Sequence, residues 1–346
     1  MNVLIWHVHG SWTTAFVQGP HRYLVPVVEG RGPEGRGRAR TWDWPDAAVE
    51  RTPDELADED VDVVVLQRPE DEDLATRWLG GRRPGVDVPA VWLEHNAPQG
   101  RINDLRHPAA DRPELRIVHV THTNALFWDT GTTPTTVIEH GIVDPGFRYT
   151  GAVPHAAVVI NEPSRRGRVT GSDLVGPLSR SVPVDLFGMG AEEFAGAART
   201  RGDDVTPFED VPQASLHDEM ATRRAYLHPV RWTSLGLSLL EAMHLGMPVV
   251  ALATTEVPAA VPPGAGVVSN QVEVLAAALR RFVAEPEEAA ACGRAARRAA
   301  LARYGLSRFL ADWDGVLGER VADHHRRRRL RPTGGSCPTT KGEVAP

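Results

Sequence analysis

The chain has 346 residues, which suits two α/β domains of ordinary size better than one small core. Its 42% hydrophobic and 24% charged residues are typical of a globular protein, and the formal net charge of −7 argues against nucleic-acid binding. The two cysteines, Cys292 and Cys337, provide neither a disulfide framework nor a metal-ligand spacing. We see no signal peptide and no stretch of about 20 apolar residues, so we expect a cytoplasmic protein.

The first half of the chain alternates short apolar runs with helical segments, which is the pattern of a parallel sheet. We predict strands over residues 3–6, 61–66, 90–93, 117–120 and 136–139. The Gly- and Arg-rich segment 29–40 is predicted to be a surface loop, and the acidic segment 43–60 to carry one short helix.

A second alternating set follows in the other half of the chain. We predict strands over residues 156–160, 182–187, 225–228, 248–252 and 266–268, and helices over 271–284, 287–304 and 306–317. The segment 144–154 is the natural hinge between the two sets. The predicted fold class is α/β, with two Rossmann-like doubly wound domains, residues 1–150 and 151–318, facing each other across a cleft.

The chain loses its apolar periodicity beyond Gly318. The basic run at residues 324–331 is followed by Pro, Gly, Ser and Thr, which predicts a disordered basic tail over residues 319–346. Such a tail could touch anionic lipid, so peripheral membrane contact is conceivable but unsupported. A solvated terminus is the favoured interpretation.

The stretch from His228 to Ala251 carries the most information about function. It predicts the end of a strand, a tight turn with Gly236, one apolar helix, and a buried strand led by Pro248. Such a turn leaves backbone N–H groups free at a helix N-terminus, which favours phosphate binding. Glu241 lies about two turns along the helix, roughly 8 Å away and within reach of a ribose. A buried packing segment with a chance Glu is the alternative.

The run Leu-Leu-Glu-Ala-Met-x-x-Gly-x-Pro-Val-Val-Ala resembles the nucleotide-sugar site of the retaining GT-B glycosyltransferases called "glycosyl transferases group 1". The resemblance is specific over residues 228–251 and weaker over nearly the whole chain. That family usually has two Glu residues separated by seven others. The second, which contacts the nucleotide ribose, corresponds to Glu241, but the first, which contacts the donor sugar, is replaced by Thr233. The resemblance therefore implies ribose binding and leaves the donor sugar open.

The same resemblance implies a GT-B fold whose last helix crosses back onto the N-terminal domain. The C-terminal domain would then bind the nucleotide sugar, and the N-terminal domain would lie on the acceptor side. The implied donor-binding residues in the turn before the helix are Ser234, Leu235, Gly236 and Leu237.

Two positions in the first domain match the family's cleft residues. Gly10 follows the first strand, where a Gly allows close approach of a ligand, and the family places such a Gly near the donor diphosphate. No Gly-x-Gly-x-x-Gly accompanies it, so a dinucleotide site is poorly supported. His95 follows a buried strand and resembles a family His near the donor sugar, which makes it the candidate catalytic residue. A packed turn remains the alternative for both positions.

Residues 161–168 open the second domain with three Arg in four positions. The family has Gly-Arg-x-x-x-x-Lys-Gly here, and its Arg and Lys neutralise the donor diphosphate. Arg166 best matches the Lys, with Arg165 and Arg168 as rivals, because Arg grips phosphate bidentately. Gly188 matches a family Gly bordering the nucleotide. A solvated basic loop is the alternative for the Arg residues.

Several histidines follow strands near carboxylates, which raises the question of a metal. His119, His122 and His140 are candidates to line the cleft beside Glu94 and Glu139. No His-x-x-x-His helix or Asp-x-Asp pair supports a metal, so we predict neither a metal site nor a cofactor.

The leading hypothesis is a metal-independent retaining glycosyltransferase with a nucleoside-diphosphate sugar as co-substrate. Its acceptor would be a glycan, a lipid or a small molecule. The alternative is a catalytically weak or inactive GT-B module that binds nucleotide sugars, which Thr233 and the atypical pair Asn161-Glu162 favour. A phosphorylase would need a cofactor lysine, and the only Lys is Lys341 in the predicted tail.

Overall fold

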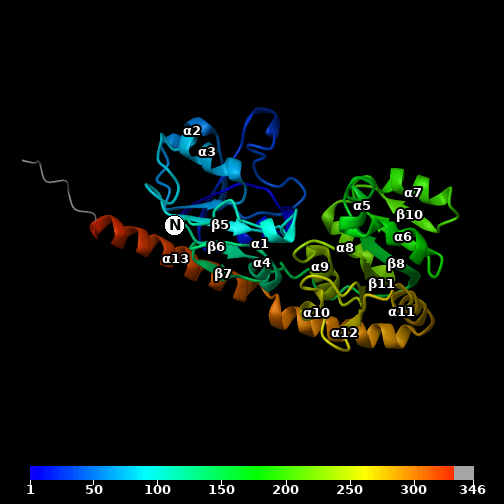
Figure 1. Ribbon diagram of the computed structural model, residues 1–346. Helices are drawn as coiled ribbons and strands as arrows, with labels where there is room; N and C mark the ends of the chain where they lie inside the picture. The colour runs from blue at the N-terminus through cyan, green and yellow to red at the C-terminus, as the bar shows by residue number, and fades with distance from the viewer. Residues whose placement is uncertain (331–346) are drawn as a thin grey trace, which may run out of the picture.

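The computed structural model describes residues 1–330 and contains two α/β units, each built on one parallel sheet (Figure 1). The first sheet has seven strands in the order β3-β2-β1-β4-β5-β6-β7. Its strands are β1 Asn2–Ile5, β2 Arg22–Pro26, β3 Ala48–Arg51, β4 Val63–Leu66, β5 Ala90–Glu94, β6 Ile117–His119 and β7 Thr135–Val137. The strand order reverses between β1 and β4, and ligands bind at such switch points in open α/β sheets.

The second sheet has six strands in the order β10-β9-β8-β11-β12-β13, and its strand order reverses between β8 and β11. Its strands are β8 Val153–Val159, β9 Val184–Phe187, β10 Val205–Phe208, β11 Arg223–His228, β12 Val249–Ala251 and β13 Gly266–Val268. The predicted α/β class with two doubly wound sheets is confirmed.

Helices cover both sheets. The first unit has α1 Gly10–Phe16, α2 Pro53–Ala57, α3 Pro69–Trp78, α4 His122–Phe127 and the short 3-10 turns Glu29–Arg31 and Ile102–Asp104. The second has α5 Pro163–Thr170, α6 Ser172–Ser179, α7 Ala191–Arg199, α8 Gln213–Thr222, α9 Leu237–Leu245, α10 Val257–Ala260, α11 Val272–Ala284 and α12 Pro286–Arg303. None of the helices in residues 1–330 is both long and apolar enough to cross a membrane.

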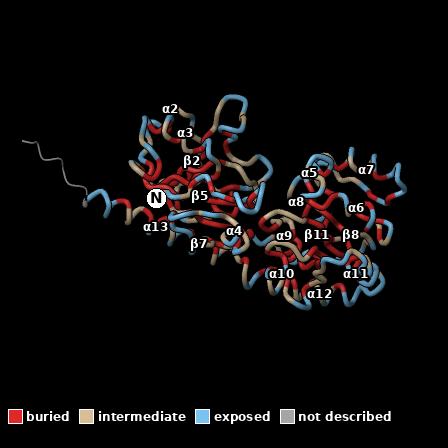
Figure 2. Tube along the Cα trace, in the orientation of Figure 1, coloured by how far each residue is buried: buried red, intermediate tan, exposed pale blue. Residues whose placement is uncertain are grey.

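The central strands of both sheets are buried on both faces, as expected for parallel sheets covered by helices. All four residues of β4 are buried, and so are all six residues of β11. Figure 2 shows the buried segments concentrated along the strands, while the outer turns are exposed. The continuous apolar runs that predicted these strands reflect this two-sided burial.

Three strands escaped the sequence prediction, and two of them lie at sheet edges. β3 falls within the acidic segment where only a helix was predicted, and β10 contains Pro207. Edge strands tolerate Pro and polar residues, because one side of the strand makes no ladder hydrogen bonds. The third, β2, lies beside β3 and ends in Pro26.

The last helix, α13 Leu306–Leu330, corrects the predicted tail. Phe309, Trp313 and Leu317 enter the core of the first unit, where Trp313 packs against Trp12 with ring centroids 5.5 Å apart. The helix continues well past Gly318, so the prediction of disorder is wrong for residues 319–330. Apolar periodicity did weaken there, but buried contacts of the basic residues replace it. The rest of the predicted tail, residues 331–346, lies outside the described part of the chain.

Arg320 illustrates how the basic end of α13 is held. Its side chain is buried and donates to the backbone carbonyl of Glu114. Arg327 donates from Nη1 to the carbonyl of Pro113 at 2.9 Å. A long Arg side chain can bury its aliphatic stem while its head finds an acceptor, so a basic run does not by itself indicate disorder.

Candidate functional site

Two adjoining cavities lie where residues from the two units meet. We call one the Glu241 cavity, which has a volume of about 660 Å³, and the other the histidine cavity, which has a volume of about 440 Å³. Five residues line both cavities and mark the boundary between them: His9, Arg166, Thr233, Gly236 and Leu237. A ligand with two chemically different ends could therefore extend across this boundary.

Glu241 projects into its cavity from α9 and is 5% exposed. Ser11, from the first unit, donates from Oγ to Oε1 of Glu241 at 2.6 Å. Gln213, at the start of α8, donates from Nε2 to Oε2 at 3.2 Å. A carboxylate offers about four acceptor sites, so Glu241 retains capacity for the hydroxyls of a ligand.

The start of α9 lines both cavities. Its N-cap is Gly236, which supplies no capping side chain. The N–H of Leu239 donates to the carbonyl of Gly236 at 3.1 Å, whereas the N–H groups of Leu237 and Ser238 depend on a ligand or on water for acceptors. A Cβ at Gly236 would lie 2.3 Å from Cε1 of His228, a buried residue whose pKa falls to about 4 because of burial. The packed imidazole of His228 therefore requires Gly at this position.

Of the three rival arginines, Arg166 alone lines both cavities. Its guanidinium has no hydrogen bond or ion pair within residues 1–330, and burial lowers its pKa, with the charge of Arg165 adding to the shift. Arg165 lines the histidine cavity but is ion-paired with Glu162. Arg168 is exposed and pairs with Asp173 at 3.2 Å. A ligand anion reaching this boundary would meet the unpaired cation of Arg166.

The chain geometry around α5 explains why these neighbours point in different directions. Gly167 has φ 44° and ψ −118°, which breaks the helix directly after Arg166. Glu162 caps the helix with φ 55°, a left-handed conformation that is uncommon for a residue other than Gly. The loose sequence match at Asn161-Glu162 thus coincides with an irregular backbone.

Gly188 lies beside the same segment and lines the Glu241 cavity. Its φ is +134°, and a Cβ there would lie 2.4 Å from the carbonyl oxygen of Ile160. Asn161 accepts a hydrogen bond at Oδ1 from the N–H of Met189 at 3.1 Å. This contact gives Asn161 a structural role at the position where the family pattern has Gly.

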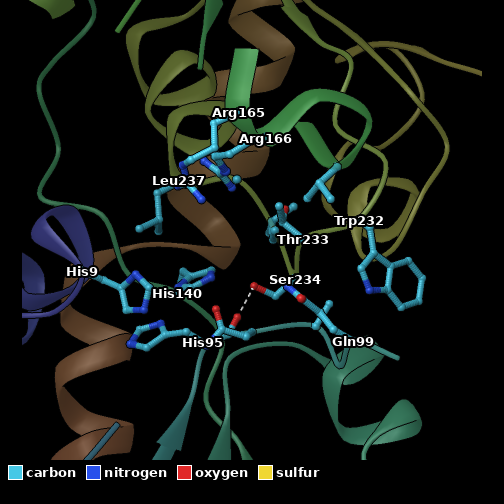
Figure 3. Close-up of a pocket in the computed structure, with 15 residues that line it drawn as sticks. His9, His95, Gln99, His140, Arg165, Arg166, Trp232, Thr233, Ser234 and Leu237 are labelled. Carbon is cyan, nitrogen blue, oxygen red and sulfur yellow. Dashed lines mark hydrogen bonds between the residues drawn. The ribbon is translucent and has the colours of Figure 1, made fainter. Parts of the chain in front are cut away.

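Three histidines from separate segments of the first unit gather in the histidine cavity: His9, His95 and His140 (Figure 3). The ring centroids of His9 and His95 are 4.0 Å apart. Burial lowers the pKa of His9 to about 4 and that of His140 to about 3, and it holds the pKa of His95 well below the usual value. All three are therefore neutral at physiological pH.

These neutral rings have unused hydrogen-bonding capacity. Nε2 of His95 and both ring nitrogens of His140 are buried without a partner in the described part of the chain. Unpaired buried polar atoms are uncommon in folded proteins. These nitrogens are almost inaccessible to solvent, so a ligand hydroxyl would reach them after a shift of the rings. This arrangement suits hydroxyl groups, since a neutral imidazole has one donor and one acceptor nitrogen.

Two hydrogen bonds connect the second unit's 232–234 loop to the loop that follows β5. Trp232 donates from Nε1 to the carbonyl of Pro98 at 2.7 Å. Ser234 donates from Oγ to the carbonyl of His95 at 2.6 Å, the bond drawn in Figure 3. The hydroxyl of Ser234 thus orients His95, a role that the donor-binding prediction for Ser234 did not include.

Between these two residues, Thr233 lines both cavities. No Asp or Glu is among the lining residues that the described chain contributes to the histidine cavity. The carboxylate that the family pattern has at position 233 is therefore not supplied by another residue of the wall. Asn96 and Gln99 provide neutral polar groups instead.

The structure brings the predicted site residues together around the two cavities. Lining the Glu241 cavity are Gly10, Arg166, Gly188, Gly236, Leu237 and Glu241. Lining the histidine cavity are His95, Arg165, Arg166, Ser234, Leu235, Gly236 and Leu237. Of the three further histidines, His140 lines the cleft, whereas His119 is buried beside His107 and His122 is exposed on α4.

Sequence reasoning missed Ser11, Gln213 and Trp232. Ser11 and Gln213 contact Glu241 from segments more than 25 residues away, so no local pattern marks them. Trp232 belongs to the motif stretch, but only its hydrogen bond to the other unit distinguishes it from a packing residue. Within residues 1–330, no cluster of three or more His, Cys, Asp or Glu has the geometry to hold a metal ion.

Solved structures similar to this chain identify the class of fold. Sucrose-phosphate synthase from Thermosynechococcus elongatus is 13% identical with a TM-score of 0.68, over 93% of this chain and 99% of that one. HepE from Anabaena, in complex with UDP-glucose, is 14% identical with a TM-score of 0.64, over 92% of this chain and 100% of the other. The two facing sheets and these neighbours show that the chain has the GT-B fold.

A third neighbour is longer than this chain. TarM from S. aureus, in complex with UDP and other ligands, is 12% identical with a TM-score of 0.57, and the match covers 74% of this chain and 55% of TarM. This chain thus spans about half of the length of TarM.

At the level of sequence, residues 197–299 match the family model described as "Glycosyl transferases group 1". The matched stretch contains α9 with Gly236 and Glu241, as the resemblance in the motif predicted. No curated protein sequence matches the chain.

Proposed function

We propose that this protein is a retaining glycosyltransferase that transfers a sugar from a nucleoside-diphosphate sugar without a metal ion. The observation that carries the proposal is the composition of the boundary between the two cavities. There the unpaired guanidinium of Arg166 and the start of α9 border both spaces, and Glu241 lies deeper in one of them. A nucleotide sugar has its diphosphate between a ribose and a sugar. This order matches Glu241 in one cavity, Arg166 and the start of α9 at the boundary, and the histidine cavity on the other side.

In this proposal the Glu241 cavity takes the nucleoside. Glu241 accepts hydrogen bonds from the ribose hydroxyls, and Ser11 and Gln213 hold its carboxylate in place. The strand–helix turn at Gly188 borders the base. The diphosphate lies against the α9 N-terminus, where backbone N–H groups and the helix dipole favour negative charge.

The histidine cavity then takes the donor sugar and the reacting hydroxyl of the acceptor. The bond between the anomeric carbon and the diphosphate oxygen breaks, and its electron pair stays on the diphosphate. The acceptor oxygen forms the new bond from the same face and loses its proton to a diphosphate oxygen. Arg166 and the α9 amides stabilise the leaving diphosphate as its charge develops, which is an electrostatic form of catalysis.

His95 positions the sugar in this scheme and is the candidate catalytic residue. Its ring is neutral because burial disfavours the protonated form, so Nε2 can exchange hydrogen bonds with a sugar hydroxyl without adding a positive charge. Ser234 fixes the backbone at His95 through the carbonyl hydrogen bond. The domains thereby align sugar and diphosphate across their boundary.

Thr233 favours one competing function, a GT-B module that binds nucleotide sugars but transfers them weakly or not at all. The wall supplies no carboxylate in its place, so the donor sugar is held by fewer charged hydrogen bonds. Binding alone would still use Glu241 and the α9 N-terminus. Turnover separates the two functions.

The test begins with a calorimetric panel of nucleoside diphosphates, headed by UDP because the TarM complex contains UDP and the HepE complex contains UDP-glucose. The matching nucleotide sugars are then incubated with the protein, and mass spectrometry follows their hydrolysis and their transfer to mixed acceptors. NMR of the product's anomeric proton gives the stereochemistry. Transfer with retained configuration supports the proposal. Binding without turnover favours the inactive module, and absence of nucleotide binding overturns both.

A further inference from the structure

A third cavity lies outside the two described above, on the loop between β2 and β3. It has a volume of about 350 Å³ and is lined by His7, Gly30, Arg31, Arg36, Arg38 and Arg40. We call it the arginine cavity. In Figure 1 this loop belongs to the blue segment on the side of the first unit that faces the second. Four Arg around one hollow are unusual in a chain of net charge −7.

The charges of this cavity are only partly neutralised. Arg31 forms a two-pronged ion pair with Glu50, with N–O distances of 2.7 and 3.0 Å. Arg38 donates to two backbone carbonyls, those of Trp44 and Ala48. No Asp or Glu is among the lining residues from the described chain, so positive charge exceeds negative charge at the cavity wall.

Arg36 and Arg40 are the two cations without partners. Both are exposed, and neither guanidinium has a hydrogen bond or ion pair within residues 1–330. Two forked guanidinium groups beside one hollow match the geometry of a phosphate or carboxylate group, because each fork can donate two parallel hydrogen bonds.

The loop is a fixed structure rather than a loose basic segment. The backbone N–H of Gly37 in the loop donates to the carbonyl of Pro26, at the end of β2, at 2.9 Å. Trp6 donates from Nε1 to the carbonyl of Glu34 at 2.9 Å, and Arg68 donates to the carbonyl of Pro33 at 2.9 Å. The cavity wall therefore exists before a ligand arrives, which lowers the entropy cost of binding.

Gly37 shows how closely the loop is built. Its φ is +68°, and a Cβ there would lie 2.3 Å from Oε1 of Glu50 and 2.5 Å from Nη1 of Arg31. Its carbonyl oxygen also contacts Nδ1 of His7 at 3.1 Å. Any larger residue at position 37 would break the ion pair at the base of the cavity.

The arginine cavity adjoins the Glu241 cavity. Arg40 lines the former, and the next two residues, Thr41 and Trp42, line the latter. Gly10 lies between them, since a Cβ on it would be 3.5 Å from Nε1 of Trp42 and 3.9 Å from Nε2 of His7. A molecule held in the arginine cavity would thus reach toward the cleft from the first unit.

We infer that the arginine cavity is a second anion site, separate from the donor diphosphate site, that receives a phosphate or carboxylate group of the acceptor. The acceptor's role in this inference rests on the proposed function, whereas the existence of the anion site does not depend on it. It narrows the acceptor to an anionic molecule, such as a sugar phosphate, whose hydroxyl extends into the cleft.

The first test is a calorimetric titration with inorganic phosphate, with the cleft saturated by the nucleoside diphosphate that binds best. We expect phosphate to bind without displacing the nucleotide. The variant R36Q/R40Q should lose at least tenfold in phosphate affinity and keep its nucleotide affinity and melting temperature, because neither side chain has a partner to lose.

The matched control is R294Q/R298Q on α12, which removes the same charge from two exposed arginines far along the chain. Phosphate affinity should be unchanged in this variant. An equal loss in both double variants means a general charge effect and overturns the inference. Competition between phosphate and nucleotide also overturns it, because phosphate would then occupy the diphosphate site.

A second titration distinguishes an acceptor site from a site for the free ion. Glucose 6-phosphate should displace inorganic phosphate from the wild-type protein, whereas glucose should not. Failure of the sugar phosphate to displace phosphate overturns the acceptor assignment. If phosphate binds normally but no nucleoside diphosphate binds in its absence or presence, the proposed function fails while the anion site stands.

Discussion

The Glu241 cavity and the histidine cavity, the two halves of the cleft, differ in the charge and the hydrogen bonding of the groups that line them. In the Glu241 cavity a charged group is held ready: the carboxylate of Glu241 already accepts two hydrogen bonds that fix its position. In the histidine cavity the imidazole groups are neutral beside the cations Arg165 and Arg166, and several ring nitrogens of His95 and His140 have no partner in the described residues. One half offers an oriented charge, and the other offers unsatisfied neutral donors and acceptors.

The difference follows from what each half would have to recognise. A ribose carries vicinal hydroxyls that one carboxylate can accept together, and it is the same in every ribonucleotide. A donor sugar and an acceptor must instead react with each other. Side chains near them must therefore not carry charges that compete with the diphosphate for its stabilising cations. Burial of three histidines achieves that neutrality, because desolvation disfavours their protonated forms.

The largest expected effect is at the boundary between the halves. Arg166→Ala should reduce donor hydrolysis and transfer by about 100- to 1,000-fold, since removal of one transition-state donor to a developing anion has this scale. Mass spectrometry of donor turnover measures it. Arg168→Ala is the control, because Arg168 is exposed and pairs with Asp173 outside the cavities. Equal activity in both variants would remove Arg166 from the mechanism.

The next prediction distinguishes the Glu241 cavity from the histidine cavity by the ligand that each one affects. Glu241→Ala should weaken the nucleoside diphosphate and the nucleotide sugar alike, by about ten- to a hundred-fold, because a charged hydrogen bond contributes about 1.5–3 kcal/mol. His95→Ala should leave nucleoside-diphosphate affinity unchanged and reduce turnover. Calorimetry and turnover assays measure the two effects. Wild-type nucleotide affinity in the Glu241→Ala variant would leave Glu241 with a packing role only.

The neutral histidines of the histidine cavity also make the stability of the protein depend on pH. The pKa of His140 is about 3 in the folded chain, below the usual 6.5. The unfolded chain therefore binds more protons as pH falls below 6.5, and stability decreases. For His140 the loss is roughly 2 kcal/mol between pH 7.5 and pH 5. Urea unfolding at both values measures it, and His140→Asn should show a smaller pH dependence. An unchanged dependence in that variant would mean that folding does not lower the pKa of His140.

An effect no larger than that of His140 concerns the end of α13, which contacts the first unit. A chain that ends at Gly318 should be less stable by about 2 kcal/mol, because it loses the buried Arg320 and the hydrogen bond of Arg327 to Pro113. Its nucleotide affinity should not change. A chain that ends at Leu330 is the control. Calorimetric melting compares the two, and equal melting temperatures would restore the interpretation of residues 319–330 as a dispensable tail.

The sequence by itself determined the fold class and the motif on which the proposed nucleotide site rests. Strands buried on both faces appear as continuous apolar runs, so most of them were predictable. The motif around Glu241 was equally visible, because a turn, a helix and a strand joined in sequence carry their chemistry at fixed local spacings. Edge strands such as β3 and β10, which lack those runs, were missed.

Only the tertiary structure decided the rest. It left Arg166 unpaired on the wall of both cavities, whereas Arg165 and Arg168 form ion pairs on either side of it. It also brought His9 together with the buried His95 and His140 from loops far apart in the chain. Contacts over long sequence separations and the desolvation that accompanies them depend on the whole packed chain, and no local pattern encodes them.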